Sequence, residues 1–487
     1  MPSTGEPVLG DPAGRRASRR SIITAAAAAA AGAAALPPNR AALARQASPV
    51  AEEGDAARLG VPENVPIDHV IVIFMENHTF DNLYGFFPGA NGLNAPGAIV
   101  TQTDRDGSVY PVLPPVSANG PGSGKDARFP DDLDNAPFNI DAWVPLSEIC
   151  PSPVHRFYQH QLQVNGGRMD RHVAWSDSGA LTMGYHQTSQ LPLSSWAAEY
   201  TLCDNFFTSA WGGSMLNHLW LISAVMPVWP NADSSLVARP VFDAAGNLVG
   251  LDRDGVVSPD GHVINDAEPW FEPHEAGEPD AARVPPQQTP TIGDRLTDAG
   301  VSWAWFAGGW DKAAAGQPAP TFVCHHQPFV YFENYAPGAP GRDHLRDETA
   351  FLASLADGAL PSVSFIKPLA DLDEHAGTSP ILASEQHAAD LLAAVKASPY
   401  WDRCAVILTY DDFGGWYDHV APYPRDQWGP GGRVPALIVS PHARRGHIEH
   451  TPLEHCSILR FIEWRWGLAP LSDRDANAWN LTVAFDF

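Results

Sequence analysis

Basic residues and cysteines are both scarce in this chain of 487 residues. Only 30 Lys and Arg stand against 56 Asp and Glu, which gives a formal net charge of −26. Because a surface of this charge repels nucleic-acid phosphates, we expect no nucleic-acid partner. The five cysteines are scattered without a C-x-x-C pair, which argues against a zinc ribbon or a thioredoxin-like motif. Charged residues make up 18% and hydrophobic residues 44%, a composition typical of a globular protein with a sizeable core.

No apolar run has the roughly 20 residues that a stable membrane-spanning helix needs. The main candidate, Ile22 to Leu36, is rich in alanine and follows a basic segment that contains Arg19 and Arg20. Basic, apolar and A-x-A-like regions in this order predict a twin-arginine export signal over residues 1–47. A poly-alanine helix in the mature protein is the alternative. With a linker over 48–66, we expect export by the twin-arginine machinery to a periplasmic, cell-wall-associated or extracellular location.

Apolar, β-branched runs alternate with helical patterns in the rest of the chain. The runs predict buried strands of a mainly parallel sheet at residues 69–75, 301–306, 362–366, 404–410 and 434–439. Apolar spacing predicts helices at residues 194–200, 216–225, 293–299, 384–397 and 454–464. Stretches rich in Pro, Gly and Asp predict loop insertions at about 100–145 and 230–290, the second with a small β-hairpin. The alternation indicates one α/β catalytic domain over 67–487.

Acidic and amide side chains directly follow two of these predicted strands. Glu76 and Asn77 follow the first strand, and Asp411 and Asp412 follow the fourth. If the two strands are neighbours, the four side chains meet at the edge of the sheet where α/β proteins bind ligands. Their oxygens suit a hard divalent metal ion, whose identity and number stay open. The alternative is that these residues only cap turns or helices.

Ser214 follows two glycines and leads into the apolar segment 216–225. At the amino end of a helix, free amides and the helix dipole favour a phosphate beside the hydroxyl. A bound metal would lower the pKa of this hydroxyl and make it a nucleophile. A plain helix cap is the alternative. The segment lacks the closing glycine of the G-x-S-x-G elbow of α/β-hydrolases, and it lacks the C/S-x-P-x-R context of sulfatases.

Histidine is abundant, with 19 residues. Near a phosphate, a protonated imidazole can neutralise a non-bridging oxygen or protonate a leaving group. A lone histidine is more often structural, so the informative ones are those in polar surroundings or in pairs. These are His155, His325, His326, His375 and His419.

Four blocks of the sequence resemble the bacterial phosphoesterase family, which contains acid phosphatases and phospholipases C and belongs to the alkaline-phosphatase-like superfamily. The blocks are residues 67–92, 165–170 with His155 upstream, 204–218, and 374–377 together with 410–420. The resemblance extends from about residue 67 to 468. It implies an α/β three-layer sandwich, in which helices flank a mainly parallel central sheet and large loops are inserted.

The resemblance also implies roles for individual residues. It places the metal on Glu76, Asn77, Asp411 and Asp412. It places the nucleophile at Ser214, which would form a phosphoserine intermediate that water later hydrolyses. It places histidines around the phosphate at His155, His325, His326 and His375, with His186 as a further pocket residue.

Two substrate classes are compatible with this resemblance. An acid phosphatase acting on phosphate monoesters is the first expectation, because phospholipase C members often carry Thr where this chain has Ser214. The chain also ends at Phe487, without the carboxy-terminal β-domains of the larger phospholipases C. A phospholipase C or another phosphodiesterase is the alternative. A catalytically silent phosphate or metal binder is the alternative from another class, and an intact nucleophile argues against it.

Overall fold

The computed structural model describes residues 64–118, 123–423 and 425–487. The predicted export signal and nearly all of the predicted linker lie outside these residues. Within the described ranges, no helix is both long enough and apolar enough to cross a membrane.

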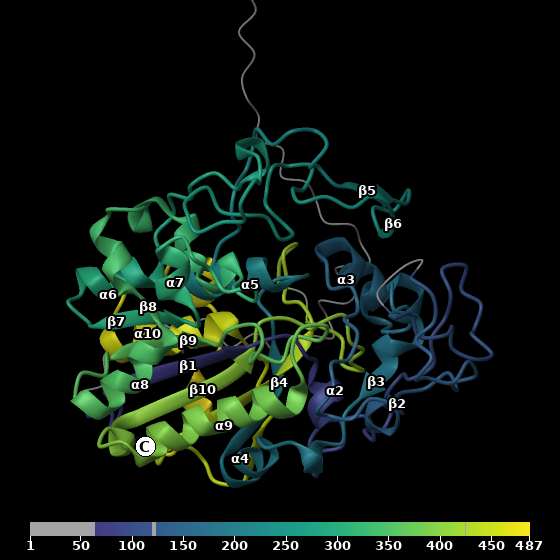
Figure 1. The fold of residues 1–487 in the computed structure, drawn as a ribbon. Helices are drawn as coiled ribbons and strands as arrows, with labels where there is room; N and C mark the ends of the chain where they lie inside the picture. Colours follow the sequence, from purple (N-terminus) through teal and green to yellow (C-terminus); the bar gives the residue numbers. More distant parts are fainter. Residues whose placement is uncertain (1–63, 119–122, 424) are drawn as a thin grey trace, which may run out of the picture.

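A nine-stranded sheet forms the centre of the molecule (Figure 1). Its strands are β1 (His69–Met75), β4 (Thr201–Phe207), β7 (Trp303–Ala307), β8 (Leu345–Asp347), β9 (Val363–Lys367), β10 (Cys404–Tyr410), β11 (Arg433–Val439), β12 (His447–Glu449) and β13 (Leu453–Glu454). Their order is β12-β4-β11-β10-β1-β9-β7-β8, and β13 also pairs with β4. All pairs are parallel except those of β11, which runs antiparallel to β10 and β4. The mainly parallel sheet is thereby confirmed.

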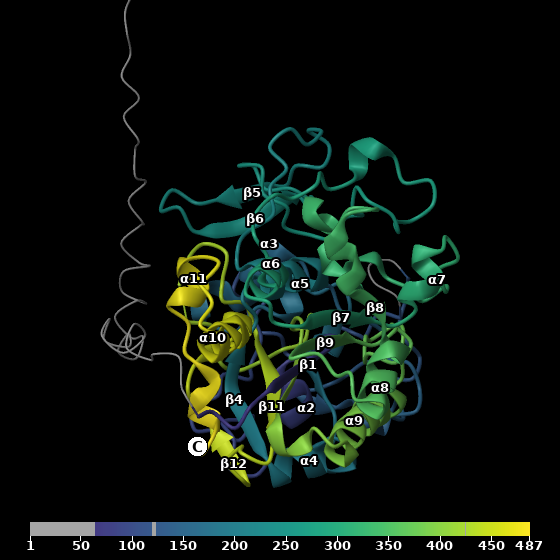
Figure 2. The same cartoon turned by 90° about the vertical axis from the view of Figure 1, so that its left-hand side faces the viewer.

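Helices cover both faces of this sheet and complete the predicted three layers. The α-helices of the described residues are α2 (Phe80–Tyr84), α3 (Phe157–Val164), α4 (Ser194–Glu199), α5 (Ser214–Ser223), α6 (Ile292–Asp298), α7 (Trp310–Ala314), α8 (Glu348–Asp357), α9 (Ile381–Ala397), α10 (His455–Trp466) and α11 (Asp473–Ala476). Figure 2 shows α5, α6 and α10 on one face and α4, α8 and α9 on the other. Strands covered on both faces must be apolar throughout, and every residue of β10 is buried.

The two predicted insertions lie outside the central sheet, the first at the right of Figure 1 and the second across its top, above α5. The first contains β2 (Phe138–Asn139), which pairs with β3 (Gly184–Tyr185) over a small hydrophobic cluster of its own. The second contains the predicted hairpin, formed by β5 (Arg239–Phe242) and β6 (Leu248–Arg253). The turn between them is closed by Asp243, whose carboxylate accepts the amide of Asn247 at 2.9 Å.

The metal site predicted from the sequence requires that the strands before Glu76 and Asp411 are neighbours. These strands, β1 and β10, are adjacent and parallel. Met75 is level with Tyr410 in this pair, so Glu76 and Asp411 leave the sheet side by side. The strand β9 lies on the other side of β1 and ends at the same edge, with Lys367 as its last residue. Three neighbouring strands therefore deliver charged side chains to one place.

Candidate active site

Ser214 lies against two of the carboxylates at this edge. It is the first residue of α5 and is 3% exposed. Its Oγ is 3.0 Å from Glu76 Oε2 and 3.0 Å from Asp412 Oδ2. A hydroxyl has one proton, so Ser214 Oγ can donate to only one of the two carboxylates. Its contact with the other carboxylate then has no proton from the hydroxyl between the two oxygens. Such an arrangement is favourable only when a proton or a cation lies between the oxygens.

The approach to Ser214 depends on the two preceding glycines. Gly212 has φ +90°, a conformation that side chains rarely adopt, and a Cβ on it would lie 2.7 Å from the backbone nitrogen of Phe157. A Cβ on Gly213 would lie 2.8 Å from the carbonyl oxygen of His155. The pair of glycines thus allows the start of α5 to pack directly against the segment that carries His155.

Several buried oxygens at the site have no hydrogen-bond partner, among them Asn77 Oδ1 and Asp411 Oδ2. Buried polar atoms are rarely left in this state, because an unpaired group loses its hydration without compensation. His218 Nδ1 is 3.6 Å from Asp411 Oδ2, but it faces the carbonyl oxygen of Ser214 at 2.8 Å. Unpaired oxygens beside two carboxylates fit a hard divalent cation.

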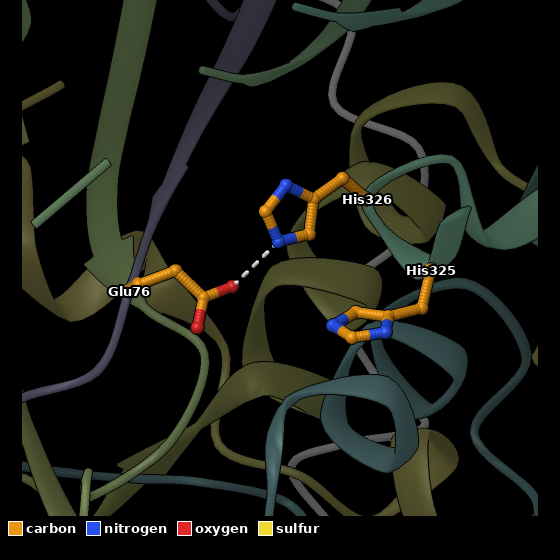
Figure 3. A group of neighbouring side chains, drawn as sticks. All are labelled: Glu76, His325 and His326. Carbon is orange, nitrogen blue, oxygen red and sulfur yellow. Dashed lines mark ion pairs between the residues drawn. The ribbon is translucent and has the colours of Figure 1, made fainter. Parts of the chain in front are cut away.

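Groups of three potential ligands converge on Glu76. One group combines Glu76 with His218 and Asp411, and the other combines it with His325 and His326. In Figure 3, both histidines of the second group come from the same short turn and lie on one side of the Glu76 carboxylate. His326 Nε2 is 3.1 Å from Glu76 Oε1. Burial and the charge of Lys367 lower the pKa of His326 to about 3, so a neutral ring donates this hydrogen bond.

The carboxylates differ in their electrostatic surroundings. Burial alone would raise the pKa of Glu76, but the ammonium of Lys367, 2.7 Å from Oε1, outweighs it together with His326 and His375. These groups hold that pKa well below its ordinary range. Burial raises the pKa of Asp412 to about 7. Burial, together with the charges of Glu76 and Asp412, raises the pKa of Asp411 well above its usual value. Groups with such opposed shifts are concentrated at functional sites.

Two other predicted histidines, His155 and His375, lie next to each other, and His155 adjoins Asn77. His155 Nε2 is 3.2 Å from Asn77 Nδ2, and the rings of His155 and His375 are 5.5 Å apart. His155 also lines a hollow of about 260 Å³ at the start of α5. Asp266, on the rim of this hollow, accepts the amide of Met215 at 3.2 Å. One of the helix amides that was expected to face a phosphate is therefore occupied by a carboxylate.

All nine residues in the predicted metal and catalytic sets thus lie in one connected group, whereas His186 does not join it. His186 contacts Asp141 at 2.7 Å and the rings of His78 and Trp416. The sequence did not point to three further members of the group, which are His218, Lys367 and Asp373. His218 lies four residues after Ser214 on α5. Lys367 directly follows an apolar run, as Glu76 does, so the same pattern could have identified it as a site residue.

Comparison with known proteins defines the class of this site. Residues 67–469 match the model of the Phosphoesterase family, so the chain belongs to this family and is a hydrolase of phosphoric ester bonds. Phospholipase C A of Mycobacterium tuberculosis is 25% identical over 489 residues, covering 92% of this chain and 82% of that protein. Non-hemolytic phospholipase C of Pseudomonas aeruginosa is 24% identical, covering 86% of this chain and 57% of that protein.

Among solved structures, a protein in the alkaline phosphatase superfamily from Vibrio parahaemolyticus is similar to this chain at 11% identity and a TM-score of 0.33. The alignment covers 70% of this chain and 73% of that protein.

Proposed function

We propose that the protein is an exported, metal-dependent phosphoesterase that cleaves phosphodiesters of the phospholipase C type through Ser214. The observation that carries the proposal is the contact of Ser214 Oγ with Glu76 and Asp412, at 3.0 Å each. A buried hydroxyl at a helix start, fixed by two carboxylates, has the features of an activated nucleophile. A silent phosphate binder would need no hydroxyl in this position.

The proposed ligands of the divalent cation are Glu76, Asn77, Asp411 and Asp412. When bound, the cation would supply Lewis acidity and neutralise negative charge next to the serine. In the reaction, Ser214 Oγ forms a bond to phosphorus and gives its proton to a neighbouring carboxylate, while the bond from phosphorus to the leaving alcohol breaks. We propose that nearby histidines, His155 and His375 among them, protonate that alcohol. Water then hydrolyses the phosphoserine and restores the hydroxyl.

We propose phosphodiesters rather than monoesters as the preferred substrates for two reasons. The sequence alone led us to expect the opposite preference. Relatives named phospholipase C align with most of the chain. In addition, the carboxylate of Asp266 accepts the amide of Met215, next to Ser214, whose hydroxyl contacts the carboxylates of Glu76 and Asp412. This negative surrounding repels the dianion of a monoester more strongly than the single charge of a diester. The serine at position 214 still favours the acid phosphatase as the second candidate.

Hydrolysis of p-nitrophenyl phosphate and p-nitrophenyl phosphorylcholine, each with and without a chelator, separates the candidates. We expect chelator-sensitive cleavage with a preference for the choline diester. Ser214→Ala should lower the rate by about 10³-fold or more. Ser223→Ala is the matched control, because this serine lies on the same helix and bonds only to Leu219 and Val225 carbonyls.

A preference for the monoester would move the assignment to an acid phosphatase with the same residues. Activity that survives in Ser214→Ala would exclude this serine as the nucleophile. Metal binding without turnover of either ester, by wild-type protein, would support the silent binder.

A further inference from the structure

A lysine without solvent exposure lies inside the proposed metal site. Lys367 ends β9, and its side chain is 0% exposed. Its Nζ is 2.7 Å from Glu76 Oε1 and 3.6 Å from Asp373 Oδ2. Burying an ammonium costs several kcal/mol unless anions compensate for the lost hydration, so a lysine in this position needs both carboxylates.

The two oxygens that face Lys367 also face a histidine. His326 Nε2 is 3.1 Å from Glu76 Oε1 and 3.8 Å from Asp373 Oδ2. Asp373 is held in place by the amide of His375, which donates to its other oxygen at 3.0 Å. Glu, Asp and His side chains are typical ligands of divalent transition metals. Here an ammonium lies among them at hydrogen-bonding distance.

Glu76 divides its two oxygens between this ammonium and the serine. Oε1 faces Lys367, and Oε2 faces Ser214 at 3.0 Å. In two-metal hydrolases, carboxylates between ions about 3.5–4 Å apart commonly act in this bridging way. Glu76 is therefore placed between two cationic positions, one beside Ser214 and one filled by the chain itself.

We propose that the Lys367 ammonium is a built-in replacement for a second metal ion, so that the site holds a single divalent cation on the Ser214 side of Glu76. The inference rests on the proposed function, because it presupposes the first metal. An ion bound to Glu76 Oε1, Asp373 and His326 would have to occupy the place of Nζ. Two cations that close together in a buried site repel each other strongly.

The test measures bound metal and the magnetic coupling between bound ions, both independently of activity. The full chain and its Lys367→Ala variant are stripped with a chelator, loaded with Mn²⁺ and freed from excess ion. Metal per chain is measured by mass spectrometry, and the spin coupling is measured by electron paramagnetic resonance. Lys396→Ala is the matched control, because Lys396 lies at the surface on α9 and pairs with Glu199 at 3.2 Å.

We expect one uncoupled Mn²⁺ per chain in the wild type and in Lys396→Ala, and a second, coupled Mn²⁺ in Lys367→Ala. A coupled pair in the wild type would overturn the inference without affecting the proposed function. A folded Lys367→Ala variant that still binds one ion would also overturn it. No bound ion in the wild type would overturn the proposed metal site and the inference together. If Lys367→Ala does not fold, the wild-type spectrum alone decides between one ion and two.

Discussion

Glu76, Asp411 and Asp412 are fully buried within one site, at an electrostatic cost that a single ammonium does not offset. Each ionised carboxylate loses several kcal/mol of hydration when it is buried without sufficient partners. Lys367 is an ion-pair partner of Glu76, whereas Asp411 Oδ2 has no hydrogen bond. Residues kept at such a cost are expected to serve binding or catalysis rather than stability.

Asp411→Asn tests the role of this unpaired carboxylate. Removing one negative charge from the proposed ligand set should reduce bound metal and lower turnover by at least about 100-fold. Metal content per chain, measured beside the rate, distinguishes a ligand from a residue that acts only in the reaction. Asp402→Asn is the control, since Asp402 is exposed just before the same strand, β10. Unchanged metal content in Asp411→Asn would exclude Asp411 as a ligand.

At this scale the sequence could predict the acidic pairs because each directly follows a long apolar run. It could not predict Asp373, which lies in a loop and meets the site only because β9 is adjacent to β1. The same holds for the orientation of Asp266 toward the start of α5, which depends on how the second insertion folds back.

At the scale of elements, β11 is fixed by a buried cation at its first residue. Arg433 donates to Asp81 at 2.9 Å and to Asp418 at 3.1 Å, and so ties α2 and the loop after β10 to this strand. Asp81, Asp418 and His419 could by themselves form a metal-binding group, but the guanidinium already supplies their positive charge. We therefore interpret this cluster as structural.

A second pair of elements, α8 and α9, is joined by a contact that depends on pH. His387 Nε2 on α9 is 2.6 Å from Glu348 Oε1 on α8. Burial lowers the pKa of His387, but the hydrogen bond to Glu348 and the negative charges of Glu348, Asp390 and Asp371 together outweigh it. They raise the pKa above its ordinary value of 6.5. The contact thus stabilises the fold fully below pH 6.5, and this stability is lost as pH rises through the higher folded-state pKa.

His387→Gln should therefore destabilise the protein by about 1 kcal/mol at mildly acidic pH and by less at alkaline pH. Thermal unfolding of both proteins at about pH 5.5 and about pH 9 measures the difference. His274→Gln is the control, because the ring of His274 contacts a backbone carbonyl and not a carboxylate. An equal loss of stability for His387→Gln at both pH values would contradict the charged contact.

The sequence predicted most accurately the strands that are buried on both faces of the sheet. The run 404–410 is β10 without any change of bounds, and 69–75 is β1. The strand β4 was not predicted, because Asp204 and Asn205 interrupt its apolar pattern. Asp204 is buried there by bonds to Asn91 and His450, which only the fold provides. The reversed direction of β11 was equally inaccessible, since an apolar run carries no information on direction.

At the scale of the whole molecule, export is a prediction from residues 1–47, which lie outside the described part of the chain. Replacing Arg19 and Arg20 by lysines should keep the protein in the cytoplasm, because the twin-arginine route depends on that pair. Fractionation of cells that express either form, with activity as the readout, measures the effect. Replacing Arg15 and Arg16 by lysines is the control, since that pair lies outside the motif.

Metal removal should weaken the entire fold, because the proposed ligands follow two central strands, β1 and β10, and adjoin the start of α5. An ion that binds only the folded state stabilises it by about 2.7 kcal/mol when its concentration is 100 times its Kd. For a domain of this size we expect a chelator to lower Tm by a few degrees, and excess divalent ion to restore it. Asp411→Asn should respond less, whereas Asp402→Asn should respond like the wild type. A wild-type Tm that does not change with chelator would show that the buried carboxylates are balanced without a metal, by protons and by Lys367.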